Sequence, residues 1–238
     1  MRRTAVLAIA LTLAPLPAAA DVTAHYAVGR DTLSVEVDDN GDYRAEVAGK
    51  VMLLRRAGTD YVVIFQGAVP LVVERQAFLK LAKNMVAGTF PPSGERRDVR
   101  IGSAGEEVVA GRRGTSWSIR VADSDGNSIR AVMSADRDLA PVGMVFMNVL
   151  DAGLETFGAM LPASNFGEAL REVMAKGAPL RLSLGEEVQL RSVSAAQIDA
   201  ARFALPGPVM DSAAFDQAMS KRSEPADADE VPEAPPLP

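Results

Sequence analysis

Short runs of β-branched and aromatic residues, separated by tight-turn signals, dominate residues 21–74. The run at 38–42 reads Asp-Asp-Asn-Gly-Asp and supplies the Asn and Gly that hairpins need at positive φ. Leu33, Val35 and Val37 alternate with polar residues, which predicts strands with one buried and one polar face. The turn signals recur at intervals of roughly ten residues, as in an antiparallel meander. The expected strands are 22–28, 32–37, 43–47, 51–56, 61–66 and 70–74.

The rest of the chain adds helices and further hairpins. Apolar residues at helical spacing predict a helix over 76–86, and a loop at 89–98 either joins two halves of one fold or marks a weak domain boundary. A buried helix is expected over 139–161, with Asp138 as cap, Pro141 in its first turn and a kink near Gly153. The other expected elements are strands 107–111, 115–121, 128–134, 180–184 and 188–193, a helix 166–175 capped by Ser164 or Asn165, an extended segment 200–208 that docks Phe203 and Leu205, and a short helix 212–219.

The first twenty residues are typical of a cleavable secretory signal peptide. Two arginines precede an apolar stretch at 5–13, Pro15 and Pro17 follow it, and three alanines lead to Asp21. A retained membrane anchor is the weaker interpretation, because the apolar stretch is shorter than the roughly 20 residues that cross a bilayer. We expect a soluble protein of the periplasm, with one domain over 21–222.

Composition excludes several classes of site. The chain has no cysteine, so disulfides, zinc-thiolate sites and thiol nucleophiles are absent, and no acylated cysteine can anchor it. The formal net charge of −6, without a strong basic stripe, argues against nucleic acid as a partner. The last segment, 223–238, is rich in proline and acidic residues, and we expect it to be disordered.

No catalytic group stands out. His25 is the one histidine and has no serine, aspartate or metal-ligand companions nearby in sequence. The runs at 38–42 and 123–127 resemble calcium loops, but both lack the downstream glutamate, and hairpin turns need the same residues. Acidic pairs such as Glu106 and Glu107 are expected to be solvated, and the glycines at 102–105 do not open a helix. We therefore expect no catalytic residue, no metal, no cofactor and no enzymatic activity.

Flexible apolar side chains gather in and around the two late helices. Methionine adapts its shape, so such a lining suits a varied hydrophobic ligand, although ordinary cores also use methionine to fill gaps. The candidate lining residues are Trp117, Met133, Met144, Phe146, Met147, Phe157 and Met160.

The layout of hairpins, helix, hairpins, two apolar helices and closing strands resembles a known family. It is similar to the half-barrel of the periplasmic lipoprotein carriers of the Lol system in Gram-negative bacteria, and more closely to an uncharacterised family of exported proteobacterial proteins with a similar fold. The segments that carry the resemblance are 26–37, 61–78, 117–134, 177–193 and the closing Phe-Ala-Leu-Pro at 203–206. The resemblance implies an α+β fold, a curved antiparallel sheet whose concave face is covered by helices.

Three functions remain open at this point. The first is a non-catalytic periplasmic carrier that holds a lipid, an acyl chain or an acylated partner between sheet and late helices. The second is an envelope interaction or structural protein with a fully packed core, which binds another protein through a sheet edge or its tail. The third, a hydrolase that uses carboxylates alone, has the least support.

Overall fold

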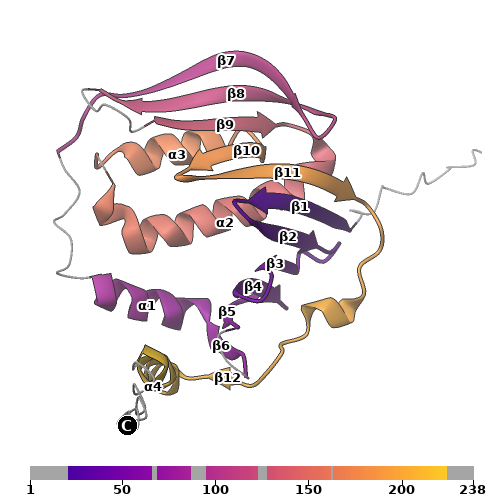
Figure 1. The fold of residues 1–238 in the computed structure, drawn as a ribbon, viewed down its shortest axis with the longest axis vertical. Helices are drawn as coiled ribbons and strands as arrows, with labels where there is room; N and C mark the ends of the chain where they lie inside the picture. The colour runs from indigo at the N-terminus through magenta and orange to yellow at the C-terminus, as the bar shows by residue number, and fades with distance from the viewer. Residues whose placement is uncertain (1–20, 66–68, 87–94, 123–127, 162, 224–238) are drawn as a thin grey trace, which may run out of the picture.

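The computed structural model describes residues 21–65, 69–86, 95–122, 128–161 and 163–223 (Figure 1). The expected signal peptide, the turn at 123–127 and all but the first residue of the acidic tail lie outside this part of the chain. No helix in the described ranges is long and apolar enough to cross a membrane.

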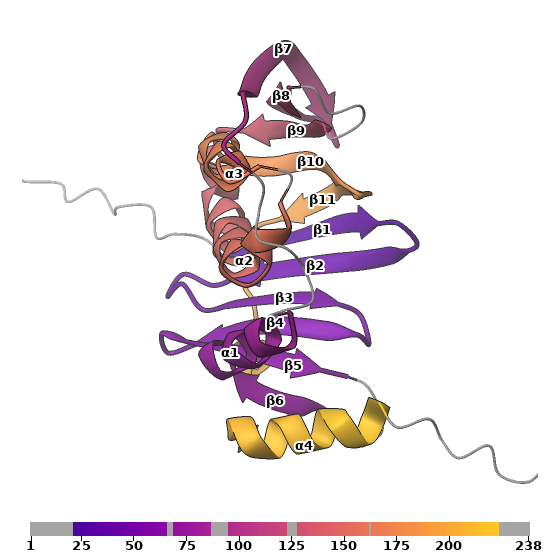
Figure 2. The same ribbon diagram turned by 90° about the vertical axis from the view of Figure 1, so that its left-hand side faces the viewer.

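A twelve-stranded sheet forms the body of the protein, in the order β12-β6-β5-β4-β3-β2-β1-β11-β10-β9-β8-β7. All neighbours are antiparallel except the two-residue strand β12, which runs parallel to β6. The fold class predicted from the sequence, α+β with helices on a curved antiparallel sheet, is confirmed (Figures 1 and 2). The strands are β1 Val22–Val28, β2 Asp31–Val37, β3 Tyr43–Val47, β4 Val51–Arg56, β5 Thr59–Ile64, β6 Leu71–Glu74, β7 Val99–Val109, β8 Arg112–Val121, β9 Ser128–Ser134, β10 Ala178–Leu184, β11 Glu186–Ser194 and β12 Val209–Met210.

Alternation along the strands gives the sheet two distinct faces. Val35 and Val37 of β2 are buried on the concave face, and Glu36 between them points to the outer face. The turn after β2 is closed locally, because Asp38 Oδ1 accepts the backbone N–H groups of Asn40 and Asp42 at 3.0 and 2.9 Å. Gly41 provides the positive φ of 83° that this turn needs.

Helices cover the concave face. Figure 2 shows α3, α2 and α1 following one another along that side of the sheet. In α2, Val142 and Val145 are buried against the strands, and the ring of Phe146 meets that of Tyr26 edge-on at 5.0 Å. The helices are α1 Arg75–Val86, α2 Ala140–Phe157, α3 Phe166–Met174 and α4 Ser212–Ser223, with short 3₁₀ turns η1 Arg137–Leu139, η2 Gly158–Met160 and η3 Ala200–Phe203.

Several local predictions were wrong. Strand β7 begins at Val99, eight residues before the predicted start, and pairs with β8. Asp138 is not the cap of α2: the 3₁₀ turn η1 precedes the helix, and Asp136 caps that turn by accepting the N–H of Asp138. The predicted cap position of α3 is confirmed at Asn165, but the side chain makes no capping hydrogen bond: its Oδ1 is buried without a partner in the described part of the chain, and its Nδ2 donates to the carbonyl of Arg97. The helix predicted over 139–161 is divided: α2 ends at Phe157 and the 3₁₀ turn η2 follows it.

The segment after β11 crosses the outer face of the sheet and returns as β12 at the far edge (Figure 1). We call residues 195–208 the strap. The predicted docking of Phe203 and Leu205 is confirmed: both pack with Met52, Leu54 and Val63 on the outer face, although the start of this segment is the 3₁₀ turn η3 and not extended chain. The sheet around β4 to β6 is thus covered on both faces.

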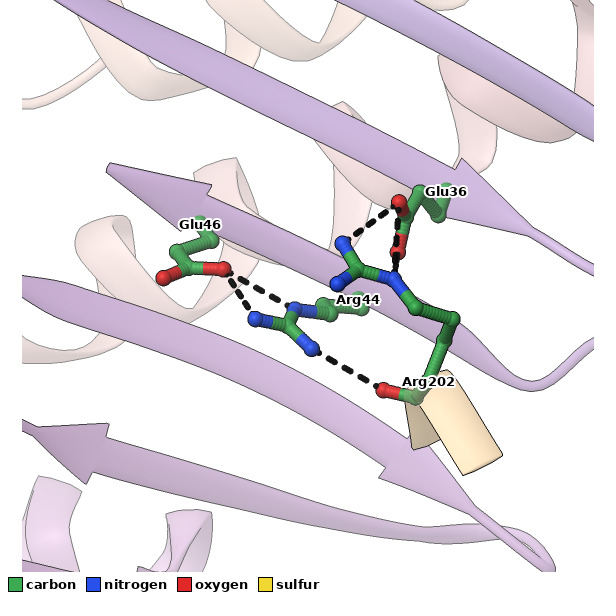
Figure 3. Close-up of polar contacts among 4 residues, drawn as sticks. All are labelled: Glu36, Arg44, Glu46 and Arg202. Atoms are coloured by element: carbon green, nitrogen blue, oxygen red, sulfur yellow. Dashed lines mark hydrogen bonds and ion pairs between the residues drawn. The ribbon is translucent and has the colours of Figure 1, made fainter. Parts of the chain in front are cut away.

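A polar network holds the strap to the outer face (Figure 3). Arg202 Nη2 and Nε donate to the Glu36 carboxylate at 2.7 and 3.2 Å, and Glu36 is only 8% exposed. Arg44 donates to the carbonyl of Arg202 at 3.2 Å and to Glu46 on the same strand. The hydrogen bond to Glu36 raises the pKa of Arg202, so this guanidinium stays charged in the fold.

Arg202→Met should lower the free energy of unfolding by about 1–2 kcal/mol, because it leaves the buried Glu36 carboxylate without its charged donor while Arg202 itself is half exposed. Urea denaturation measures the change. Arg100→Met is the matched control: Arg100 pairs with Asp98 on the surface, where its side chain is 79% exposed, and should change stability by less than about 0.5 kcal/mol. Equal effects of the two substitutions would show that the network in Figure 3 does not hold the strap.

Candidate functional site

A row of polar side chains crosses the concave face at one level. Tyr43 on β3 is the register partner of Arg55 on β4, and Arg55 is the partner of Asp60 on β5. Arg75, the first residue of α1, follows β6 directly and reaches the same carboxylate. The three strand residues lie on one face, because side chains at partnered positions of neighbouring strands share a face of the sheet. We call these three residues and Arg75 the arginine row.

Asp60 lies at the centre of the arginine row. Its Oδ1 accepts from Arg55 Nε at 2.7 Å and from the Tyr43 hydroxyl at 3.2 Å. Its Oδ2 accepts from Arg55 Nη2 at 3.0 Å and lies 3.0 Å from Arg75 Nη2. The Arg55 guanidinium also stands over the Tyr43 ring, 5.3 Å from its centroid. Two guanidinium groups thus share one carboxylate.

Burial changes the chemistry of Tyr43. The side chain is 3% exposed, and burial, together with the negative charge of Asp60, raises the pKa of Tyr43 to about 12. The hydrogen bond to Asp60 likewise raises the pKa of Arg55. At neutral pH the phenol therefore donates a hydrogen bond, and the row carries two positive charges and one negative.

Two clefts adjoin the arginine row on the concave side. The first, with a volume of about 150 Å³, lies between α1, α2 and the sheet and is lined by Leu53, Phe78, Leu79 and Arg75 among others. The second, of about 210 Å³, lies beside the first half of α2 and is lined by Val37, Arg55, Met144 and Met147 among others. Tyr43 and Asn148 line both clefts, so the two adjoin.

Most residues that line the two clefts are apolar, and Tyr43, Asn148 and Thr156 add uncharged polar groups. Among the described residues that line them, Arg55 and Arg75 are the charged ones, and Asp60 stands behind them without lining either cleft. Helices α1 and α2, which form the walls of the first cleft, are bridged by Lys83 and Glu155, with 2.7 Å between Nζ and Oε1. The arrangement is a mostly apolar cleft with positively charged guanidinium groups in its lining.

The structure brings only part of the predicted lining to these clefts. Met144 and Met147 line the second cleft, and Phe157 lines the first. Met133 is buried in a packed core between β8 to β10 and α3, and Trp117 and Phe146 pack against that same core. Met160 is exposed. Three of the seven residues thus line the two clefts.

Sequence reasoning missed the arginine row. Tyr43 and Arg55 occupy inward positions of predicted strands, so alternation places them on the buried face, whereas Asp60 lies one residue before the predicted strand 61–66 and falls inside the observed β5. Charged residues at two inward positions of one hairpin, with a tyrosine on the neighbouring strand, were the available signal. Arg75 could be placed in the row only from the structure, which shows that α1 begins directly after β6.

The other candidates from the sequence lie apart. His25 is exposed on the outer face of β1, and the run at 38–42 is a hairpin turn closed by its own Asp38. Within the described ranges, no group of three or more histidine, aspartate or glutamate side chains could hold a metal ion. His25 lines neither cleft, and of the run at 38–42 only Gly41 lines the second.

No protein-family model matches the chain, and no curated protein matches it significantly in sequence. The site is therefore interpreted from its own geometry.

Tyr43→Phe should weaken the dependence of stability on alkaline pH. Because folding raises the pKa of Tyr43 from about 10 in the unfolded chain to about 12, its contribution is complete below pH about 10 and is lost as pH rises towards the folded value, at up to roughly 1.4 kcal/mol per pH unit. Urea denaturation at pH values from about 8 to 12 measures the slope. Wild type should lose more stability than Tyr43→Phe over this range, and parallel curves would contradict the raised pKa.

Proposed function

We propose that this chain is a non-catalytic carrier for a hydrophobic or acylated ligand, which it holds on the concave face of the sheet between α1 and α2. The observation that carries the proposal is the pair of adjoining clefts, whose walls are mostly apolar side chains from the sheet and α2, with α1 contributing to the first cleft. Binding sites for small molecules are typically concave and mostly apolar, with a few placed polar groups. The site lies further towards α1 than the late helices that the sequence favoured.

Size constrains how a ligand lies. Pockets for drug-sized ligands measure roughly 300–1,000 Å³, and the two clefts measure about 150 and 210 Å³. A ligand in this site therefore spans both clefts and contacts Tyr43 and Asn148, which line each of them. The Lys83 and Glu155 pair is exposed, so little energy holds α1 against α2 at that point.

The proposed setting is the periplasm, and it depends on the first twenty residues. Their charged start, apolar stretch and small residues before Asp21 favour export with cleavage. An apolar ligand needs a carrier protein to move through an aqueous compartment. The similarity of the layout to the periplasmic lipoprotein carriers supports the same function, as an analogy of fold.

Native mass spectrometry of the protein purified from its native compartment, followed by lipid extraction, tests the proposal. Carriage predicts a bound mass that organic extraction releases. A ligand-free mass, together with no binding of hydrophobic fluorescent probes, would contradict the proposal.

Ala152→Trp should block uptake, because Ala152 lines the first cleft and an indole there fills the space between α1 and α2. We expect hydrophobic-probe affinity to fall at least about tenfold, a difference of roughly 1.4 kcal/mol. Ala213→Trp on the exposed surface of α4 adds the same side chain away from the clefts and should leave probe affinity unchanged. If both variants bind probes as wild type does, the ligand does not occupy this cleft.

One observation favours a second function, an envelope interaction protein. Strand β7 ends the sheet order and leaves its outer edge without a partner strand in the described part of the chain, whereas strap and α4 contacts cover the β6 end. An open edge of this kind can pair with a strand from another protein. Val108 on β7 is 66% exposed.

Val108→Lys should abolish co-purification of a partner that pairs with β7, because an edge lysine opposes strand addition. Pull-down from the envelope fraction with the full chain measures this. Val209→Lys is the control at the opposite end of the sheet, where Val209 is also exposed. Retention of every co-purifying protein by both variants would exclude edge pairing at β7.

A further inference from the structure

The charges within the arginine row do not cancel. Arg55 and Arg75 line the clefts and share one carboxylate, Asp60, whose side chain is mostly buried behind them. Asp42 adds a further negative charge that acts on Arg55, but its Oδ1 accepts the N–H of Ala57 at 2.8 Å and it lines neither cleft. Within the arginine row itself, two guanidinium groups share one carboxylate, and Arg75 lines the apolar first cleft.

Arg75 is the less satisfied of the two arginines. Its Nε is buried and has no acceptor among the described residues, while Nη2 contacts Asp60. Arg55, by contrast, donates to Asp60 from both Nε and Nη2. Arg75 is also the first residue of α1, whose first turn contains no acidic residue, so the partial positive charge of the helix N-terminus adds to that of the guanidinium.

The walls around this charge accept a hydrocarbon chain. Phe78 and Leu79 of α1 face Val149 and Phe157 of α2 across the first cleft, and Leu53 and Val62 of the sheet form its floor. The small volumes of the two clefts fit one chain better than two. The apolar cleft and the positive charge beside it are complementary to an acid with an apolar tail.

We infer that the ligand is a single-chain amphiphile with a carboxylate head, a fatty acid, whose head pairs with Arg75 and Arg55 and whose tail lies between α1 and α2. The inference rests on the proposed carrier function and adds the identity of the head group. A carboxylate supplies the one negative charge that the arginine row lacks, and it offers Arg75 a charge-assisted hydrogen bond.

A comparison of ligands on the wild-type protein tests the head group. Dodecanoate, 1-dodecanol and dodecylammonium share one chain and differ in charge, and isothermal titration with each gives the affinity. We expect dodecanoate to bind at least about tenfold more tightly than 1-dodecanol, and dodecylammonium to bind most weakly. Vesicles of dioleoyl phosphatidylglycerol form a further arm, with an anionic head on two chains.

Variants assign the effect to Arg75. In Arg75→Gln, dodecanoate affinity should fall to that of 1-dodecanol, and 1-dodecanol affinity should stay as in wild type. Arg100→Gln removes an arginine that pairs with Asp98 away from the clefts, and it should bind all three ligands as wild type does. A thermal unfolding curve accompanies each variant, and if Arg75→Gln does not fold, the wild-type ligand series alone decides.

The outcomes separate this inference from the function on which it rests. Equal affinity for dodecanoate and 1-dodecanol would overturn the carboxylate and leave carriage standing. Binding of the phosphatidylglycerol alone would overturn the single chain. If none of the ligands bind and the native mass is ligand-free, both the inference and the carrier function fail.

Discussion

The packing of α2 on the concave face is the constraint on which the other contacts depend. Val142 and Val145 of this helix, with Leu139 just before it, bury the middle of the sheet around Tyr26, where β1 and β11 join the two halves. Tyr26 is buried and its hydroxyl donates to the carbonyl of Pro179 at 3.0 Å, so its one polar group is satisfied inside the core. With α2 fixed there, α1 and α3 have a wall on either side, and the space between α1 and α2 becomes a cleft and not open surface.

Much of the fold could be predicted because its strands carry their own signals. The β1 to β6 meander alternates and turns at Gly and Asn, so strand positions followed from residues 21–74 with errors of one or two positions. The predicted start of β7 was eight residues too late because Gly102, Ser103 and Gly105 lack the β-branched pattern, and pairing with β8 imposes the strand despite them. The start of the segment 200–208 was predicted as extended chain, but it forms the 3₁₀ turn η3, which Asp199 caps by accepting the N–H of Ala201.

The candidate site was less accessible from sequence, because it depends on register. Met144, Met147 and Phe157 could be selected by residue type, and they do line the clefts. Residue type also selected Met133 and Trp117, which fill or border a packed core, since methionine and tryptophan serve both uses. Tyr43, Arg55, Asp60 and Arg75 are unremarkable one at a time. They form a site only because the register of β3, β4 and β5 and the start of α1 bring them together.

The central place of β1 has a consequence for how the chain reaches its fold. Its partner on one side is β2, next in sequence, but on the other it is β11, and Asp21 just before β1 accepts the N–H of Ile198, 177 positions away. The meander β1 to β6 can pair by itself, yet the free edge of β1 stays open until the far end of the chain arrives. Pairing at such separation is slow, and an open edge during that delay invites association between chains. The seam in the middle of the sheet therefore depends on a pairing between the two ends of the described chain, and the strap, which follows β11 directly, reaches the outer face from that seam.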